Sequence, residues 1–205
     1  MIAQTGSPGT WIAVAAAGAV GLVASSAAAR RPTISATERR VFRAINRLPD
    51  GLYPLLWLPM QLGNLVVGTT VGFVMALLVG AIGMAIGVVV AMVLKLVTER
   101  VIRHEMSRYL EVRRRPGTSQ PGAILRGDVP ADGPSFPSGH VVLVAAISCV
   151  VATELSLALV VAAFALTAIV AVGRVYVAAH NPLDVLAGLG AGLLVGGVIA
   201  TVLTW

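Results

Sequence analysis

Long apolar segments dominate this sequence and restrict the folds open to it. A helix needs about 20 apolar residues to cross the hydrocarbon core of a bilayer. Hydrophobic residues make up 57% of the chain and charged residues 12%, whereas a soluble domain has roughly 25% charged residues. We therefore predict a membrane protein. Its predicted spans lie at about 9–29, 64–80, 82–103, 139–154, 156–175 and 182–204.

Helices are the expected form of these spans. Inside a bilayer every backbone polar group must be bonded within the protein, which leaves helices or a closed barrel. The sequence lacks the alternating ten-residue pattern of barrel strands, so we predict an all-α polytopic bundle of about six transmembrane helices. The small residues of "AGLGAGLLVGG", 187–197, predict close packing between helices. The single cysteine, Cys149, lies within a span and is predicted to be a small buried residue.

The first apolar segment has two interpretations. Its end, "ASSAAARR", resembles a signal-peptide cleavage site, but a signal peptide has basic residues before its apolar core, and "MIAQTGSPGTW" has none. We favour a retained anchor helix, with residues 1–34 as the anchor and 35–205 as the main domain of the same bundle.

The basic residues gather on one side of the predicted membrane. All Lys and Arg residues lie in the link after the first span, between Lys95 and Arg126, or at Arg174, and six spans put these places on the same side. The net charge of +6 thus concerns a membrane face and not nucleic acid. Basic residues favour the cytoplasm, so we expect a multi-pass plasma-membrane protein with this side inside and a C-terminal reporter outside.

The link after the first span is predicted to be an interfacial helix. Its "SATE" stretch matches a capping box, in which Ser35 caps the helix and Glu38 reaches back to it. Lipid headgroup contact and anchoring is the first interpretation of this helix, and substrate gating is the second. Apolar Val41, Phe42, Ile45 and Leu48 alternate at helical spacing with Arg39, Arg40, Arg43 and Arg47.

Three polar clusters lie at ends of spans on this side, where polar residues are functional candidates. The first is "RYLEVRRRPG", in which Arg108 and Arg115 are two helical turns apart and share a face. Its alternative interpretation is a solvated basic helix end, with Glu111 paired to Arg115 and Glu99 to Arg103.

The second cluster is "SFPSGHVVLV", 135–144. Ser138 suits a helix N-cap, and the free amides of a helix N-terminus bind phosphate readily. A cap explains Ser138 but leaves His140 without an explanation.

The third cluster is "GRVYVAAHNPLDVLAG", 173–188. Asn181 and Pro182 mark a helix start, which makes Asp184 the third helical residue and a favourable charge there. Asp184 is also four residues after His180, close enough to hold one ring nitrogen and set the tautomer. A lone Arg174 would suit a headgroup contact.

Together the clusters bring two histidines, a carboxylate and three arginines to one face. Guanidinium groups bind phosphate oxygens bidentately, while one imidazole can attack phosphorus and the other can transfer a proton. This combination favours phosphate chemistry on an amphiphile at the membrane surface.

The same stretches resemble the signature motifs of the type 2 phosphatidic acid phosphatase (PAP2) superfamily of membrane lipid phosphatases. The family pattern is Lys-x6-Arg-Pro, Pro-Ser-Gly-His and Ser-Arg-x5-His-x3-Asp, and the resemblance covers roughly residues 35–204. The sequence departs from it twice, with Arg108 at the Lys position and Gly173 at the Ser position.

The resemblance implies a mechanism without metal or cofactor. His180 would attack phosphorus and form a phosphohistidine, Asp184 would hold its other ring nitrogen, and His140 would protonate the leaving oxygen and then activate water. The residues implied to bind phosphate are Arg108, Arg115, Ser138, Gly139 and Arg174.

The substrate is expected to be a lipid phosphate among membrane lipids. Candidates are phosphatidate, phosphatidylglycerol phosphate, polyprenyl mono- or diphosphates and polyprenyl-linked sugar phosphates. The loop with Arg126, Asp128 and Asp132 either shapes this choice or is a plain surface loop. The alternative function is a non-catalytic protein that binds or transports phospholipid. Many bacterial members of the resembled family have sites facing out, in conflict with the charge rule.

Overall fold

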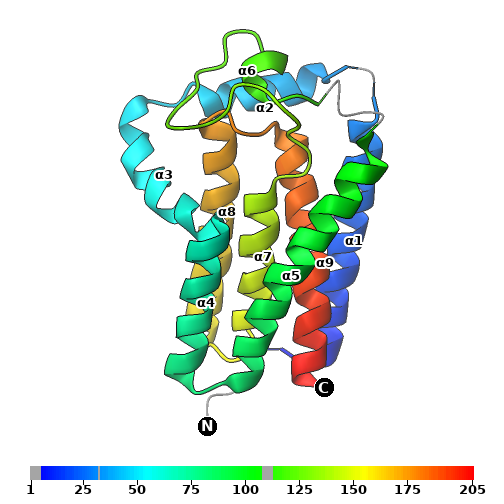
Figure 1. The fold of residues 1–205 in the computed structure, drawn as a ribbon, viewed down its shortest axis with the longest axis vertical. Helices are drawn as coiled ribbons and strands as arrows, with labels where there is room; N and C mark the ends of the chain where they lie inside the picture. Colours follow the sequence, from blue (N-terminus) through cyan, green and yellow to red (C-terminus); the bar gives the residue numbers. More distant parts are fainter. Residues whose placement is uncertain (1–5, 32, 108–112) are drawn as a thin grey trace.

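The computed structural model describes residues 6–31, 33–107 and 113–205. Each predicted span is helical in it, and these helices stand side by side along the long axis of the molecule (Figure 1). The prediction of an all-α bundle is therefore confirmed. The six helices are α1 (Pro8–Ala29), α4 (Leu65–Val79), α5 (Ile82–Glu105), α7 (Gly139–Val151), α8 (Leu157–Tyr176) and α9 (Pro182–Thr204).

The helices differ in how they meet the criteria for a membrane span. Within the described residues, α1, α5, α8 and α9 are each long and apolar enough to cross a membrane, and α4 with the preceding segment Asp50–Gly63 makes a fifth candidate bent by 74°. Helix α7 has 13 residues, of which all but His140 are buried. Because protein surrounds α7, it need not match the full thickness of the lipid.

Close contact between α1 and α9 depends on glycine. A Cβ atom added to Gly190 would lie 2.5 Å from the backbone nitrogen of Leu22, and one added to Gly18 would lie 2.5 Å from the backbone nitrogen of Leu194. Cys149 is fully buried against Trp11 and its neighbours. The predicted small-residue packing and the buried cysteine are both confirmed.

One end of the bundle is covered by α2 (Ala36–Asn46), the short α6 (Pro116–Ser119) and the segment between α6 and α7 (Figure 1). We call it the charged end. The predicted helix after the first span is confirmed as α2, with the Ser35 side chain accepting a hydrogen bond from the Glu38 backbone amide at 3.1 Å. Its buried residues are Glu38, Phe42 and Asn46, so this face packs on the bundle.

The expected capping box is wrong in its second half. The Glu38 carboxylate binds Arg113 and the backbone amide of Leu183, both far away in the chain. A carboxylate buried under α2 gains more from a cation and a distant amide than from the amide of its own cap.

The segment between α6 and α7 is anchored by Arg126, which is 8% exposed. Its guanidinium donates to the backbone carbonyls of Asn46 and Tyr176, both at 2.8 Å, and lies 4.0 Å from the centre of the Tyr176 ring. Arg126 therefore ties this segment to α2 and α8. The remaining elements, η1 (Asp50–Leu52), α3 (Tyr53–Met60) and η2 (Gln61–Gly63), connect α2 to α4.

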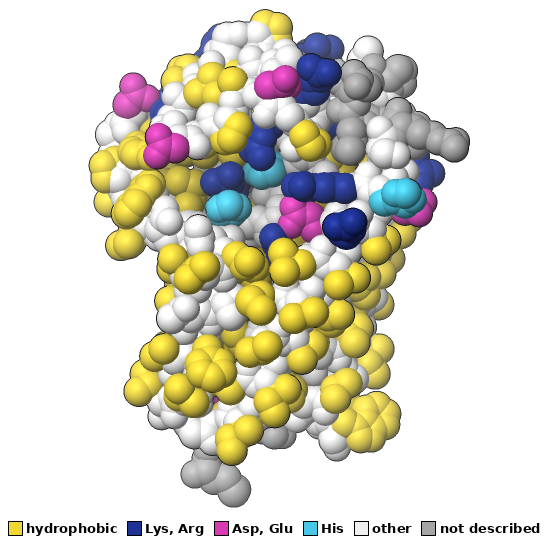
Figure 2. Space-filling view, viewed as in Figure 1, with side chains coloured by type: hydrophobic (Ala, Val, Ile, Leu, Met, Phe, Trp, Pro, Cys, Tyr) yellow, Lys and Arg dark blue, Asp and Glu magenta, His cyan; other side chains and the backbone are white. Residues whose placement is uncertain are grey.

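The surface divides along the same axis. Figure 2 shows a hollow near the charged end where basic, acidic and histidine side chains gather, above a region covered by hydrophobic side chains. This is the distribution expected of a membrane protein with a polar site at the interface.

Candidate active site

His180 lies in the short turn between α8 and α9, and its surroundings determine its tautomer. Its Nδ1 is 2.7 Å from the backbone carbonyl oxygen of Ser135, and its side chain is almost wholly buried. A carbonyl oxygen can only accept a hydrogen bond, so Nδ1 carries the proton. The lone pair of the neutral ring is therefore on Nε2.

The backbone of this turn is held from α8. The Arg174 carbonyl accepts hydrogen bonds from the backbone amides of Ala179 and His180, at 3.0 and 3.2 Å. Ala178 adopts a left-handed conformation, with φ of 61°, which lets the chain reverse within so few residues. The end of α8 thus sets the positions of both Arg174 and His180.

The expected contact between Asp184 and the His180 ring is not present. Asp184 Oδ2 accepts from Ser135 Oγ at 2.6 Å and from the Asn181 amide at 2.7 Å. Asp184 is the third residue of α9, as predicted, and from there its carboxylate reaches back to the helix cap. Its link to His180 passes through Ser135, whose carbonyl holds the ring.

Arg113 joins this network and was missed from sequence. It donates to Asp184 Oδ1 through Nε at 2.9 Å and through Nη2 at 2.7 Å, and to Glu38 through Nη2 at 2.6 Å. Burial lowers the pKa of Arg113, but Asp184 and Glu38 outweigh burial and raise it above its usual value. Glu38 shares a helical face with Phe42, so a buried acid in need of a cation was the available signal.

The start of α7 presents an unused side-chain donor. Ser138 occupies the predicted N-cap, but its side chain makes no capping bond. Its Oγ is buried and has no hydrogen-bond partner within the part of the chain that the structure describes. Gly139 follows, and a Cβ atom there would lie 2.6 Å from Glu99 Oε2. The absence of a side chain at Gly139 lets α5 approach the start of α7.

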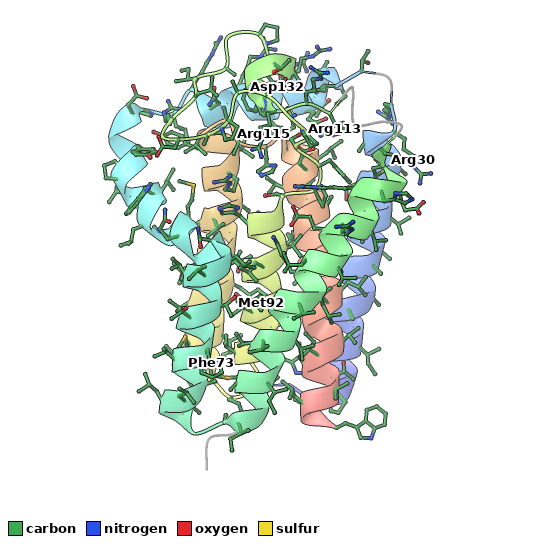
Figure 3. All side chains as sticks on the ribbon, in the orientation of Figure 1. Arg30, Phe73, Met92, Arg113, Arg115 and Asp132 are labelled. Atoms are coloured by element: carbon green, nitrogen blue, oxygen red, sulfur yellow. The ribbon has the colours of Figure 1, made fainter. Side chains whose placement is uncertain are left out.

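The predicted arginines differ in how their side chains are held near His180. Arg174 Nε is buried and, among the described residues, has no partner. Arg115 Nη1 donates to the Ala179 carbonyl at 3.2 Å, which brings it to the His180 turn. Figure 3 shows Arg113 and Arg115 at the charged end, between the covering segments and the helix ends below. Arg108 lies outside the described residues.

The charges around His180 favour its neutral form. Burial, followed by the nearby positive charges of Arg174 and Arg115, holds the pKa of His180 well below its usual value of 6.5. His140 is close enough for its charge to act on the same ring, and Arg174, Lys95 and Arg115 act on His140. The site therefore combines a neutral imidazole, a second imidazole and several cations.

Within residues 6–31, 33–107 and 113–205, no group of three or more His, Cys, Asp or Glu side chains could hold a metal ion. The arrangement can bind a phosphate group between its cations and bring a nucleophilic nitrogen to phosphorus.

Comparisons with known proteins identify the family and the fold. The model of the PAP2 superfamily matches residues 81–205, more than half of the chain. The structure of Aquifex aeolicus LpxE is similar with a TM-score of 0.70 and 20% identity, covering 82% of this chain and 97% of that chain.

A second similar structure is that of the first transmembrane PAP2 type phosphatidylglycerolphosphate phosphatase from Bacillus subtilis. Its TM-score is 0.63 at 20% identity, covering 90% of this chain and 93% of that chain. No curated protein sequence matches. The chain therefore belongs to the PAP2 superfamily and has the fold of its membrane phosphatases.

Proposed function

We propose that this protein hydrolyses a lipid phosphate through a phosphohistidine on His180. The observation that carries the proposal is the bond between His180 Nδ1 and the Ser135 carbonyl, because it leaves the lone pair of Nε2 for attack on phosphorus. Ser138 Oγ and Arg174 Nε, both buried without a partner among the described residues, supply donors for phosphate oxygens.

The proposed reaction has two steps. Nε2 of His180 bonds to phosphorus while the bond to the lipid oxygen breaks, and that oxygen takes its electron pair and a proton from His140. Water then gives a proton to His140 and attacks phosphorus, which breaks the P–N bond and releases inorganic phosphate. Arg115 and Arg174 compensate the charge that builds up on the phosphoryl oxygens. No metal ion or cofactor enters either step.

The remaining predicted residues take supporting roles in this proposal. The amide of Gly139 and the Arg108 side chain would add phosphate contacts, and Asp184 would act through Ser135 as a positioning residue. The substrate class is any lipid whose phosphate lies at the charged end while its chains stay beside the apolar helices: phosphatidate, phosphatidylglycerol phosphate, polyprenyl phosphates or diphosphates, or polyprenyl-linked sugar phosphates.

The test is phosphate release from a panel of these lipids by the purified protein, with vanadate as inhibitor. Replacing His180 with Ala should lower the rate of phosphate release by several orders of magnitude, as the removal of a catalytic nucleophile does in other enzymes. The matched control is His104→Ala, which removes an exposed histidine at the end of α5 and should leave the rate unchanged.

Retention of more than about a tenth of the rate by His180→Ala, a barrier change of only about 1.4 kcal/mol, would contradict the assignment. Rapid-quench labelling with a lipid carrying ³²P should place label on the protein, and this label should be absent in the same variant. Lipid binding without any phosphate release would instead support the non-catalytic alternative.

A further inference from the structure

Three charged side chains on α5 face the site and have no role in the proposed reaction. Lys95 Nζ lies 2.7 Å from Glu99 Oε2, and Arg103 Nη2 lies 2.5 Å from Glu99 Oε1. The three residues are spaced four apart and share one face of the helix. We call this group the α5 triad.

Burial separates Lys95 and Glu99 from an ordinary surface ion pair, whereas the Arg103 side chain is 40% exposed. The side chains of Lys95 and Glu99 are 13% and 14% exposed, although they lie on a helix apolar enough to span a membrane. Exposed pairs at this spacing stabilise a helix by only about 0.2–0.5 kcal/mol, and charges within a membrane span are costly. Stability alone therefore gives little reason to bury the charges of Lys95 and Glu99.

The triad reaches the start of α7. Glu99 lies so close to Gly139 that a Cβ there would be 2.6 Å from its carboxylate. Lys95 is among the charges that act on His140, whereas those acting on His180 are Arg174, Arg115 and His140. The triad is thus on the His140 side of the site, where the leaving group departs.

The triad also has a surplus positive charge and an unused hydrogen-bond donor. One carboxylate neutralises only one of its two cations, which leaves a net charge of +1. Arg103 Nε is buried and, in the described parts of the chain, makes no hydrogen bond. Arg103 is also close enough to Arg115 for the two charges to interact. A second anion beside the phosphate being cleaved would use this surplus.

We propose that the α5 triad is a second anion subsite, which holds the phosphate that stays on the lipid when a lipid diphosphate loses its terminal phosphate. This rests on the proposed function and narrows its substrate class to lipid diphosphates. His180 bonds to the terminal phosphorus, and the bond from that phosphorus to the bridging oxygen breaks. The bridging oxygen takes the electron pair and becomes part of a lipid monophosphate, whose charge Lys95 and Arg103 compensate.

The test compares farnesyl diphosphate with farnesyl monophosphate, which share one hydrocarbon chain. Lys95→Gln and Arg103→Gln each leave Glu99 with one cationic partner, so both should fold. Each should lower kcat/KM for the diphosphate by about tenfold or more, the effect of losing one charge-assisted hydrogen bond, and for the monophosphate by less than about threefold. Arg100→Gln, at an exposed position of the same helix, is the matched control and should change neither.

A second measurement reads binding without turnover. In the His180→Ala protein, inorganic pyrophosphate should protect against thermal unfolding at lower concentrations than inorganic phosphate, and adding Lys95→Gln should remove the difference. Equal losses on both farnesyl substrates, or no loss on either, would overturn the subsite while leaving the phosphatase intact. Phosphate release from other lipids of the panel but not from farnesyl diphosphate would also overturn the subsite. Absence of phosphate release from every lipid of the panel, both farnesyl substrates included, would refute the proposed function, and the subsite with it.

Discussion

Replacing Arg113 with Met tests the buried network that supports the site. The Arg113 side chain is 3% exposed and binds two carboxylates, Glu38 at 4% and Asp184 at 0% exposure. Methionine fills similar space but leaves both carboxylates without their cation. Removing one partner of a buried ion pair costs about 3–5 kcal/mol, and we expect a loss of at least this size because two acids share the arginine.

The change should be visible as a lower unfolding temperature. For a chain of this length, 1 kcal/mol corresponds to about 2–4 °C, so Arg113→Met should lower Tm by at least about 6–20 °C. Cys149 is the single cysteine and is fully buried. A thiol-reactive fluorophore therefore reports unfolding in detergent without any added label site.

The neighbouring Arg114 provides the control. Its side chain is 43% exposed and lies 3.6 Å from Asp132, a pair expected to contribute at most about 1 kcal/mol. Arg114→Met should therefore lower Tm by only a few degrees, and Arg113→Lys should give an intermediate loss because it keeps the charge without the forked geometry. If Arg113→Met and Arg114→Met had equal Tm values, the buried network would not carry the stability assigned to it.

Two further predictions concern helix packing and the His180 ring. Gly190→Ala should destabilise the protein by about 1–3 kcal/mol in the same thiol assay, because its Cβ would lie 2.5 Å from backbone. Gly21→Ala, whose Cβ would meet only Gly190 Cα at an ordinary 3.8 Å, should be neutral, and equal losses would refute the packing argument. Because burial and the charges of Arg174 and Arg115 lower the pKa of His180, its ring should stay neutral with the proton on Nδ1 when pH falls through 6.5. The unfolded chain would protonate this ring first, so stability should fall over the same range. NMR of labelled imidazoles, assigned by the signal lost in His180→Ala, checks this, and a midpoint at or above 6.5 would contradict it.

Much of the fold followed from patterns local to the chain. The apolar segments were predicted to be helical because backbone polar groups in lipid must be bonded within the protein and the sequence lacks the pattern of barrel strands. The amphipathic spacing around Phe42 predicted α2, and "HNPLD" predicted the start of α9 with Asp184 as its third residue. The number of spans also predicted that the three polar clusters lie at one end, because successive helices cross the membrane in opposite directions.

The partners of the buried charges were decided only by tertiary structure. Asp184 is bound by Arg113 from a segment 71 residues away, and Glu38 by the same arginine 75 residues away. Spacing along one helix places a carboxylate on a face, but which cation meets that face depends on how α2 and the residues just before α6 lie across the end of the bundle. The Ser135 carbonyl that holds His180 is a backbone atom, so no residue type indicates it.

The sequence by itself determined a helical membrane bundle with basic, acidic and histidine side chains at one end, because hydrophobicity and helix capping act over a few residues. The fold decided that Ser135 carries the orienting role expected of Asp184, and that Glu99 comes to lie against Gly139. Both outcomes depend on close approach between distant backbones, since a contact of a few ångströms is set by the packing of whole helices.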